Sequence, residues 1–143
     1  MDESGFAVDM PRINGYSQIG KRCYGKCNWH AKGRVNVIGA AINMNFVAVT
    51  LFEDYIDSDV FYQWTINCLL PILTQNSVIV LDNAAFHKRQ DIQQVITNAG
   101  HILKYLPAYS PDLNQIEHKW AQAKKFRRKL QCDVEELFTE HIN

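Results

Sequence analysis

Two short apolar runs with an amphipathic segment between them set the strongest limit on the fold of this chain. The runs SVIVLD (77–82) and HILKYLP (101–107) have the length and composition of β-strands. The segment between them, 89–100, has apolar residues at helical spacing and ends in glycine, a usual helix stop. The first run is continuously apolar, which predicts a strand buried on both faces. Strands that alternate with helices in this way predict an α/β fold.

More elements are predicted on both sides of this unit. They are strands at 34–42 and 46–53 joined by a tight turn at 44–45, and helices at 57–73, at 110 to about 131, and at 133–142. The two strands are rich in β-branched and aromatic residues and predict an antiparallel hairpin. The complete order predicts a mixed sheet flanked by helices on both faces. In such sheets the functional groups gather at the carboxyl ends of the strands.

The composition indicates a globular chain in which charge is concentrated locally. Hydrophobic residues make up 47% and charged residues 21% of the 143 residues, as in an ordinary single domain. No apolar run reaches the roughly 18–20 residues of a membrane span, and the first residues lack a signal-peptide pattern, so we expect an intracellular protein with no membrane contact. The net charge is zero, yet basic residues gather at 21–34 and 119–129. These clusters are either solvated faces or contacts for an anionic partner.

Cysteine usage does not favour a metal site. Cys23, Cys27 and His30 have the spacing C-x3-C-x2-H, which is a poor zinc pattern without an obvious fourth ligand. An intracellular chain of this length needs no disulfides. We therefore expect free thiols.

Two carboxylates occupy positions suited to chemistry. Asp82 ends a strand that is predicted to be buried, and Asn83 and His87 follow it as polar neighbours. A buried carboxylate is costly unless it is paired or bound to a metal, although Asp82 could instead cap the next turn. Glu117 lies in the first turns of a helix that the stiff stretch PAYSPDLNQ precedes.

Two capping patterns compete at the start of that helix. Asn114 with Glu117 fits a capping box, whereas Ser110 with Pro111 fits an N-cap followed by proline at the first helical position. Asp112 is a second residue able to cap in its place. Glu117 is free for chemistry only if Ser110 or Asp112 is the cap.

The periodicity of this helix places Glu117 beside its apolar face. The predicted buried stripe consists of Ile116, Trp120, Ala123 and Leu130. Glu117, Lys124 and Arg128 follow a neighbouring line at spacings of seven and four residues. A metal site with a phosphate backbone running past it would need this layout.

A two-metal site would need a third acid. The candidates are Asp2, Glu3 and Asp9 near the start of the chain. Magnesium prefers oxygen ligands and is commonly held by a few carboxylates together with substrate phosphate. Two such ions about 3.5–4 Å apart can serve the attacking and the leaving oxygen of an in-line displacement.

Three motifs resemble those of a known family. DESGF, VIVLDNAAFH and LPAYSPDLNQIEHKW are similar to the three motif blocks of DDE-superfamily transposase catalytic domains, in particular the mariner-like group and bacterial insertion-sequence relatives. The 34 residues between Asp82 and Glu117 are typical of this group. The family usually has proline where this chain has Ala108 and Gln115, and both differences loosen the turn slightly.

The resemblance implies a ribonuclease-H-like fold whose Asp2, Asp82 and Glu117 bind divalent metal, Mg²⁺ or Mn²⁺, as two ions. The implied reaction is DNA cleavage followed by strand transfer in the transposition of an insertion sequence, a form of DNA recombination and integration. The residues expected to support the triad are Asn83, His87 and Asn114. The residues expected to bind DNA are Lys124, Arg128, Lys21 and Arg22.

The resemblance also predicts a truncated first strand, because Asp2 stands near its end in the family. Residues 1–143 correspond to the catalytic domain and lack the N-terminal DNA-binding domain. Expected partners are transposon-end and target DNA and a second copy or a longer transposase product, in the bacterial cytoplasm at the nucleoid. The alternatives are a catalytically inert fragment that binds DNA or a full-length partner, and an unrelated phosphoesterase with the same fold.

Overall fold

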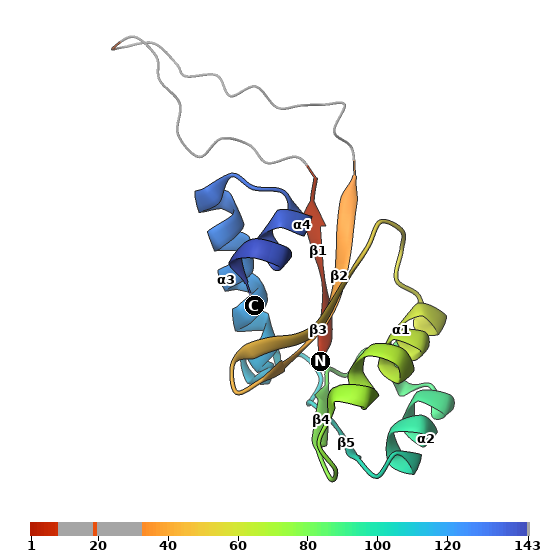
Figure 1. Cartoon of the computed structure of the whole chain (residues 1–143). Helices are drawn as coiled ribbons and strands as arrows, with labels where there is room; N and C mark the ends of the chain where they lie inside the picture. Colours follow the sequence, from red (N-terminus) through yellow and green to blue (C-terminus); the bar gives the residue numbers. More distant parts are fainter. Residues whose placement is uncertain (9–18, 20–32, 143) are drawn as a thin grey trace.

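The structure, a computed structural model, describes residues 1–8, 19 and 33–142 (Figure 1). Several residues singled out in the sequence lie outside this part of the chain: Asp9, Lys21, Arg22, Cys23, Cys27 and His30. Within it, no helix has both the length and the apolar composition needed to cross a membrane.

Five strands form two sheets. The antiparallel sheet has the order β1 (Asp2–Ala7), β2 (Arg34–Ile42), β3 (Asn45–Phe52). The other sheet pairs β4 (Val78–Leu81) with β5 (Ile102–Tyr105) in parallel. The predicted hairpin is confirmed, but its turn lies one residue earlier than predicted, at Asn43 and Met44. These two residues have φ of 50° and 64°, as a two-residue hairpin turn of this hand requires.

The predicted helices are confirmed, some with irregular ends. They are α1 (Ser58–Trp64), which continues through a π turn (Thr65–Leu69) and a 3-10 turn (Leu70–Ile72); α2 (Gln90–Asn98); α3 (Gln115–Leu130); and α4 (Val134–Glu136), followed by a π turn (Leu137–His141). Short 3-10 turns lie at Ala85–Lys88 and Pro111–Leu113. The side chain of Asp57 caps α1 by accepting from two backbone N–H groups. Gly100, with φ of 85°, follows α2 as the expected stop.

Helices cover both faces of the antiparallel sheet, as predicted. In Figure 1, α3 and α4 lie on one side of β1–β3, and α1 and α2 lie on the other side beside β4 and β5. Neighbouring strand residues point to opposite faces, so Ile38 packs into the core with α1 and α2. Val37 packs into the second core with α3 and α4. The predicted mixed α/β arrangement is confirmed.

The sequence predicted one mixed sheet, whereas the strands form two sheets that are joined only partly. β1 begins at Asp2 opposite Gly39, whereas β2 continues to Ile42, so the last residues of β2 pair with β3 alone. The backbone nitrogen of Met1, just before β1, donates to Val80 O of β4 at 2.9 Å and so connects the two sheets. A hollow of about 350 Å³ remains beside this bond, between the end of β2 and β4.

This junction explains a wrong prediction about β4. The continuously apolar run was expected to be buried on both faces, but Val78 and Val80 are 57% and 40% exposed. Ile79 and Leu81 point to the core with α1 and α2. Val78 and Val80 line the hollow instead, where no neighbouring strand of the described chain covers them.

The buried face of α3 differs from prediction at its far end. Ile116, Trp120 and Ala123 are buried as predicted, but Leu130 is 40% exposed. The helix ends at Leu130, and the chain turns away at Gln131 with a left-handed φ of 57°, so no core remains for that side chain to contact. Arg127 takes the last position on the buried face and is 7% exposed.

Arg127 connects three segments through its guanidinium. Its Nη1 donates to Ala7 O at 2.7 Å, and its Nη2 donates to Val8 O at 3.4 Å. Its Nε donates to Cys132 O at 3.1 Å. The bond to Cys132 O is buried and those to Ala7 O and Val8 O are partly buried, so Arg127 holds α3 against the end of β1.

We predict that Arg127→Met lowers the free energy of unfolding by about 2–4 kcal/mol, because it removes three charge-assisted hydrogen bonds, one buried and two partly buried. Urea denaturation measures the change. Arg128→Met is the matched control, since this exposed neighbour should change the value by less than about 0.5 kcal/mol. Equal effects of the two substitutions would contradict the role of Arg127.

Candidate active site

The fold brings the three predicted carboxylates to one region. Asp82 directly follows β4, Asp2 is the first residue of β1, and Glu117 lies in the first turn of α3. Asp82 and Glu117 line a cleft of about 370 Å³ whose wall is residues 106–111. The carboxyl end of β4 therefore opens onto this cleft, as expected for an α/β sheet.

Asp2 joins this group through Asn114. Asp2 is 4% exposed, and its Oδ2 accepts a hydrogen bond from Asn114 Nδ2 at 3.2 Å. Asn114 itself lines the cleft. Asp2 is thus held by burial, by pairing with β2 and by an amide that also faces the cleft.

The carboxylates of this region repel one another electrostatically, and this repulsion affects the pKa of Asp2. Burial raises the pKa of Asp2 to about 7, and the neighbouring Glu3, Glu117 and Asp82 add to the increase. Several carboxylates that disfavour each other's charge form a donor set that suits a hard divalent cation, which takes oxygen ligands and would relieve the repulsion. The donors present therefore fit Mg²⁺ or Mn²⁺.

The three carboxylates do not converge on a single point. Among the described residues, the only three candidate ligand groups that all lie within 4.8 Å of one another are Glu136, Glu140 and His141 on the surface. Exposed acidic groups of that kind carry no argument for a metal by themselves.

His87 is the buried residue that fixes Asp82. Its side chain is fully buried, with Nδ1 2.5 Å from Asp82 Oδ1 and Nε2 3.1 Å from Glu3 Oε2. The rings of Phe61 and Phe86 lie against the imidazole at centroid distances of 4.5 and 4.1 Å. Since both ring nitrogens face carboxylates, the imidazole carries a proton on each nitrogen and donates twice.

The charge of Asp82 depends on this contact. Burial lowers the pKa of His87, but hydrogen bonds to Asp82 and Glu3 outweigh that effect and raise it to about 9. The hydrogen bond from His87 in turn lowers the pKa of Asp82, assisted by the backbone N–H of Ala84, which donates to Asp82 Oδ1 at 3.1 Å. Asp82 is consequently ionised and oriented at neutral pH.

The structure separates the candidates for a third acid. Asp2 and Glu3 are neighbours on β1 and point to opposite sides, as strand residues do. The carboxylate of Glu3 is engaged by His87, whereas that of Asp2 accepts from Asn114 in the lining of the cleft. Asp9 lies outside the described residues.

Both capping interpretations of α3 are wrong in detail. Asn114 occupies the N-cap position but makes no side-chain capping bond, and its Nδ2 donates to Asp2. Ser110 precedes the 3-10 turn that begins at Pro111, and its hydroxyl donates to Ala108 O rather than capping. Glu117 is free of capping all the same, and its exposed side chain lines the cleft.

The remaining predicted residues are placed as follows. Asn83 lines the cleft next to Asp82. Lys124 lies with its Nζ 5.3 Å from the centroid of the Phe6 ring, and Arg128 is exposed further along α3. Lys21 and Arg22 lie outside the described residues.

Sequence reasoning missed the role of Glu3 in holding His87. The available signal was the alternation of strand residues, which turns Glu3 away from the side that Asp2 faces. The pairing with His87 spans 84 residues and had no local signal.

Comparison with known proteins agrees with this geometry. The family model described as DDE superfamily endonuclease matches residues 1–137. No curated protein sequence matches the chain. The solved structures similar to it include the Mos1 strand transfer complex, with a TM-score of 0.68 and 16% identity over 87% of this chain and 39% of that one. The Mos1 transposase paired-end complex with left transposon end has a TM-score of 0.64 and 15% identity over 99% of this chain and 49% of that one. The Mos1 mariner paired-end complex with Mn has a TM-score of 0.62 and 16% identity over 95% of this chain and 48% of that one.

These matches confirm the ribonuclease-H-like fold class. At 15–16% identity the likeness concerns the fold alone. The chain spans less than half the length of the Mos1 chains, between 39% and 49% of them.

We predict that the metal-free protein loses stability as pH rises from about 6.5 to about 9. The folded protein keeps the proton on His87 up to about pH 9, whereas the unfolded chain releases it near the ordinary pKa of 6.5. The free energy of unfolding in EDTA should fall by roughly 1–3 kcal/mol across this window. Urea denaturation at several pH values measures it.

His87→Asn should remove the larger part of this fall and leave the smaller loss near pH 7 that the ionisation of Asp2 causes, whereas His118→Gln, a change at an exposed histidine of α3, should keep all of it. The imidazole NMR resonance of His87 in the unmodified protein reports the same proton directly. A resonance that titrates near pH 6.5 would contradict the bond to Asp82 and Glu3.

Proposed function

Because the chain belongs to the DDE superfamily endonucleases, we propose that it cleaves DNA with divalent metal and transfers the cut strand in the transposition of an insertion sequence. Asp2, Asp82 and Glu117 are the proposed ligands of two ions, Mg²⁺ or Mn²⁺. The observation that carries the proposal is the cleft that Asp82 and Glu117 share, with the buried Asp2 tied to it through Asn114.

The residues of the chain have separate tasks in this reaction. His87 keeps Asp82 ionised and oriented at the end of β4. Asn114 orients Asp2, and α3 presents Glu117 from the facing side of the cleft. Divalent cations bound at these carboxylates would serve the attacking and the leaving oxygen of an in-line displacement. The residues 106–111 form the wall against which the scissile strand lies.

DNA is the proposed substrate for two reasons. Lys124 and Arg128 follow Glu117 along one line of α3, so a phosphate backbone that passes the cleft meets both cations. The similar Mos1 structures are a strand transfer complex, a complex with left transposon end and a complex with Mn, and we extend DNA and divalent metal from them to this chain.

The chain is proposed to act within a larger assembly. Its match spans less than half of the Mos1 chains, so recognition of transposon ends is assigned to a second copy or to a longer transposase product. We place this assembly on target and transposon DNA in the bacterial cytoplasm, at the nucleoid.

We predict that Asp82→Asn and Glu117→Gln each lower metal-dependent DNA cleavage more than about 100-fold, since loss of an outer-shell partner alone costs 10–100-fold at a metal site. Cleavage of supercoiled DNA with Mg²⁺ or Mn²⁺ measures the effect. Asp112→Asn is the matched control, because this exposed carboxylate lies in the adjacent turn outside the lining of the cleft.

Cleavage that survives both substitutions would overturn the assignment. DNA binding without any metal-dependent cleavage by the unmodified chain would favour the alternative of a catalytically inert DNA-binding fragment.

We also predict that Lys124→Gln with Arg128→Gln weakens duplex DNA binding for all sequences. Each lost phosphate contact should reduce the slope of log K against log salt by about 0.9. Fluorescence anisotropy at several salt concentrations measures this slope. Lys104→Gln, at an exposed lysine on β5, should leave it unchanged, and an equal change there would contradict the placement of DNA along α3.

A further inference from the structure

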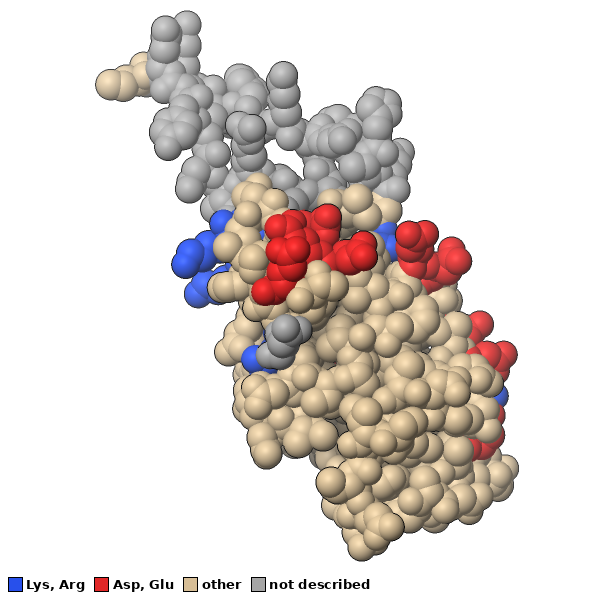
Figure 2. All heavy atoms as spheres, in the orientation of Figure 1, with Lys and Arg blue, Asp and Glu red and all other residues tan. Residues whose placement is uncertain are grey.

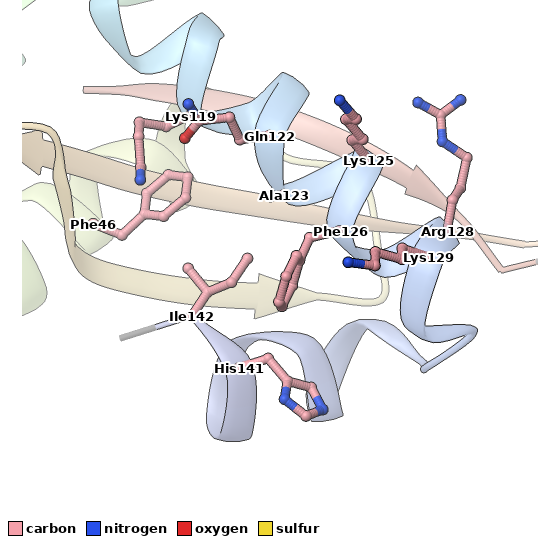
Figure 3. Close-up of a pocket in the computed structure, with 10 residues that line it drawn as sticks. All are labelled: Phe46, Lys119, Gln122, Ala123, Lys125, Phe126, Arg128, Lys129, His141 and Ile142. Carbon is pink, nitrogen blue, oxygen red and sulfur yellow. The ribbon is translucent and has the colours of Figure 1, made fainter.

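A broad hollow lies on the side of α3 that faces away from the catalytic cleft. It has a volume of about 940 Å³, and an apolar floor is made by Phe46 of β3, Phe126 of α3 and Ile142. Figure 3 shows the two aromatic rings on either side of Ile142. Phe126 is 41% exposed although it belongs to this floor, so its ring is available for contact.

Cations surround this floor. Lys119 and Lys129 stand near its two ends, with Lys125 and Arg128 also in the lining, and the lining contains no carboxylate. None of these cations forms an ion pair with an acidic group of the described chain. Lys119 instead lies with its Nζ 5.6 Å from the centroid of the Phe46 ring.

The acidic residues nearby mark one border of the hollow. Glu136 lies 3.8 Å from His141 Nε2, and His141 is part of the lining. Figure 2 shows acidic side chains gathered over α4 and basic ones at the edge of the molecule over α3. A polyanion in the hollow would meet cations on the α3 side and carboxylates on the α4 side.

A ligand that matches both parts of the hollow must combine negative charges with a flat apolar group. Nucleotides have this combination, since their phosphates bind lysine and their bases stack on aromatic rings. A duplex offers its phosphates but keeps the faces of its bases stacked inside, so it would leave the floor uncovered. Lys119 and Lys129 are about 15 Å apart along the helix, enough for a few nucleotides of an extended strand.

We propose that this hollow binds an unpaired stretch of nucleic acid, with phosphates at Lys119 and Lys129 and a base against Phe126. The inference rests on the proposed function in that DNA is the polyanion. The hollow would be a second contact with that DNA, separate from the carboxylates. Phe126 and Glu117 are nine residues apart on α3 and hence about 180° apart around it, so a strand held here leaves the cleft free.

The test measures binding of the full chain to a ten-nucleotide oligo(dT) and to a short hairpin duplex by fluorescence anisotropy in EDTA, so that no cleavage occurs. Phe126→Leu should weaken oligo(dT) binding by roughly 5- to 100-fold, because stacking is lost while an apolar side chain remains. The duplex affinity should change much less.

The lysines give a second readout. Lys119→Gln with Lys129→Gln should reduce the salt slope of oligo(dT) binding by about 1.4, which is two phosphate contacts on a single strand. The matched controls are Tyr55→Leu, at an aromatic residue that is 84% exposed in the loop before α1, and Lys104→Gln. Both controls should keep wild-type affinity and slope, and thermal unfolding verifies that every variant is folded.

Three results would overturn the proposal. The first is oligo(dT) binding that does not respond to Phe126→Leu, and the second is duplex binding that depends on Phe126 as strongly as oligo(dT) binding does. The third is displacement of oligo(dT) by a tyrosine-containing oligoglutamate peptide that binds more tightly. The last would assign the hollow to an acidic protein segment. The proposed function fails separately, if the unmodified chain never cleaves DNA with metal while its oligo(dT) binding persists.

Discussion

The buried imidazole of His87 is the contact on which the arrangement of the site depends. β1 and β4 belong to different sheets, and among the described residues one backbone hydrogen bond, from Met1 to Val80, connects them. His87 adds a side-chain connection by binding Asp82 after β4 and Glu3 on β1. Two carboxylates would repel each other across that junction, whereas a protonated imidazole between them attracts both. His87 therefore fixes the carboxylate of Asp82 relative to Glu3 on β1, in addition to the Met1–Val80 bond.

The position of α3 is set at both of its ends. At the beginning, Asn114 donates to Asp2, and at the far end Arg127 donates to the carbonyls of Ala7, the last residue of β1, and of Val8. Between these points Trp120 packs directly on β2, where a side chain at Gly39 would put its Cβ 2.9 Å from the indole. The helix is thus fixed lengthwise along β1. Glu117 and the cations of α3 take their places from that alignment.

Local patterns predicted the elements and the main carboxylates well. The strand that precedes Asp82 and the helix that contains Glu117 both have short-range signals, so their existence was predictable although the burial of the strand and the first residue of the helix were not. The partners of these residues were not predictable, because Glu3 meets His87 across 84 residues and Arg127 meets Ala7 across 120. The exposure of Val78 and Val80 was missed for the same reason, since it depends on how far β1 extends beside β4. Periodicity indicates which face of an element is apolar, but the chain elsewhere decides what covers it.

The hollow between the end of β2 and β4 leaves part of a sheet edge open among the described residues. Its borders carry exposed apolar side chains, among them Ile42 at 43% and Val78 at 57%. The last residues of β2 also present backbone groups on the side that β1 does not reach. Open backbone positions beside apolar side chains are the surface on which extended chains add to one another. Among the described residues, this edge combines open backbone positions with exposed apolar side chains, so an additional strand would find both hydrogen-bonding groups and apolar contacts there.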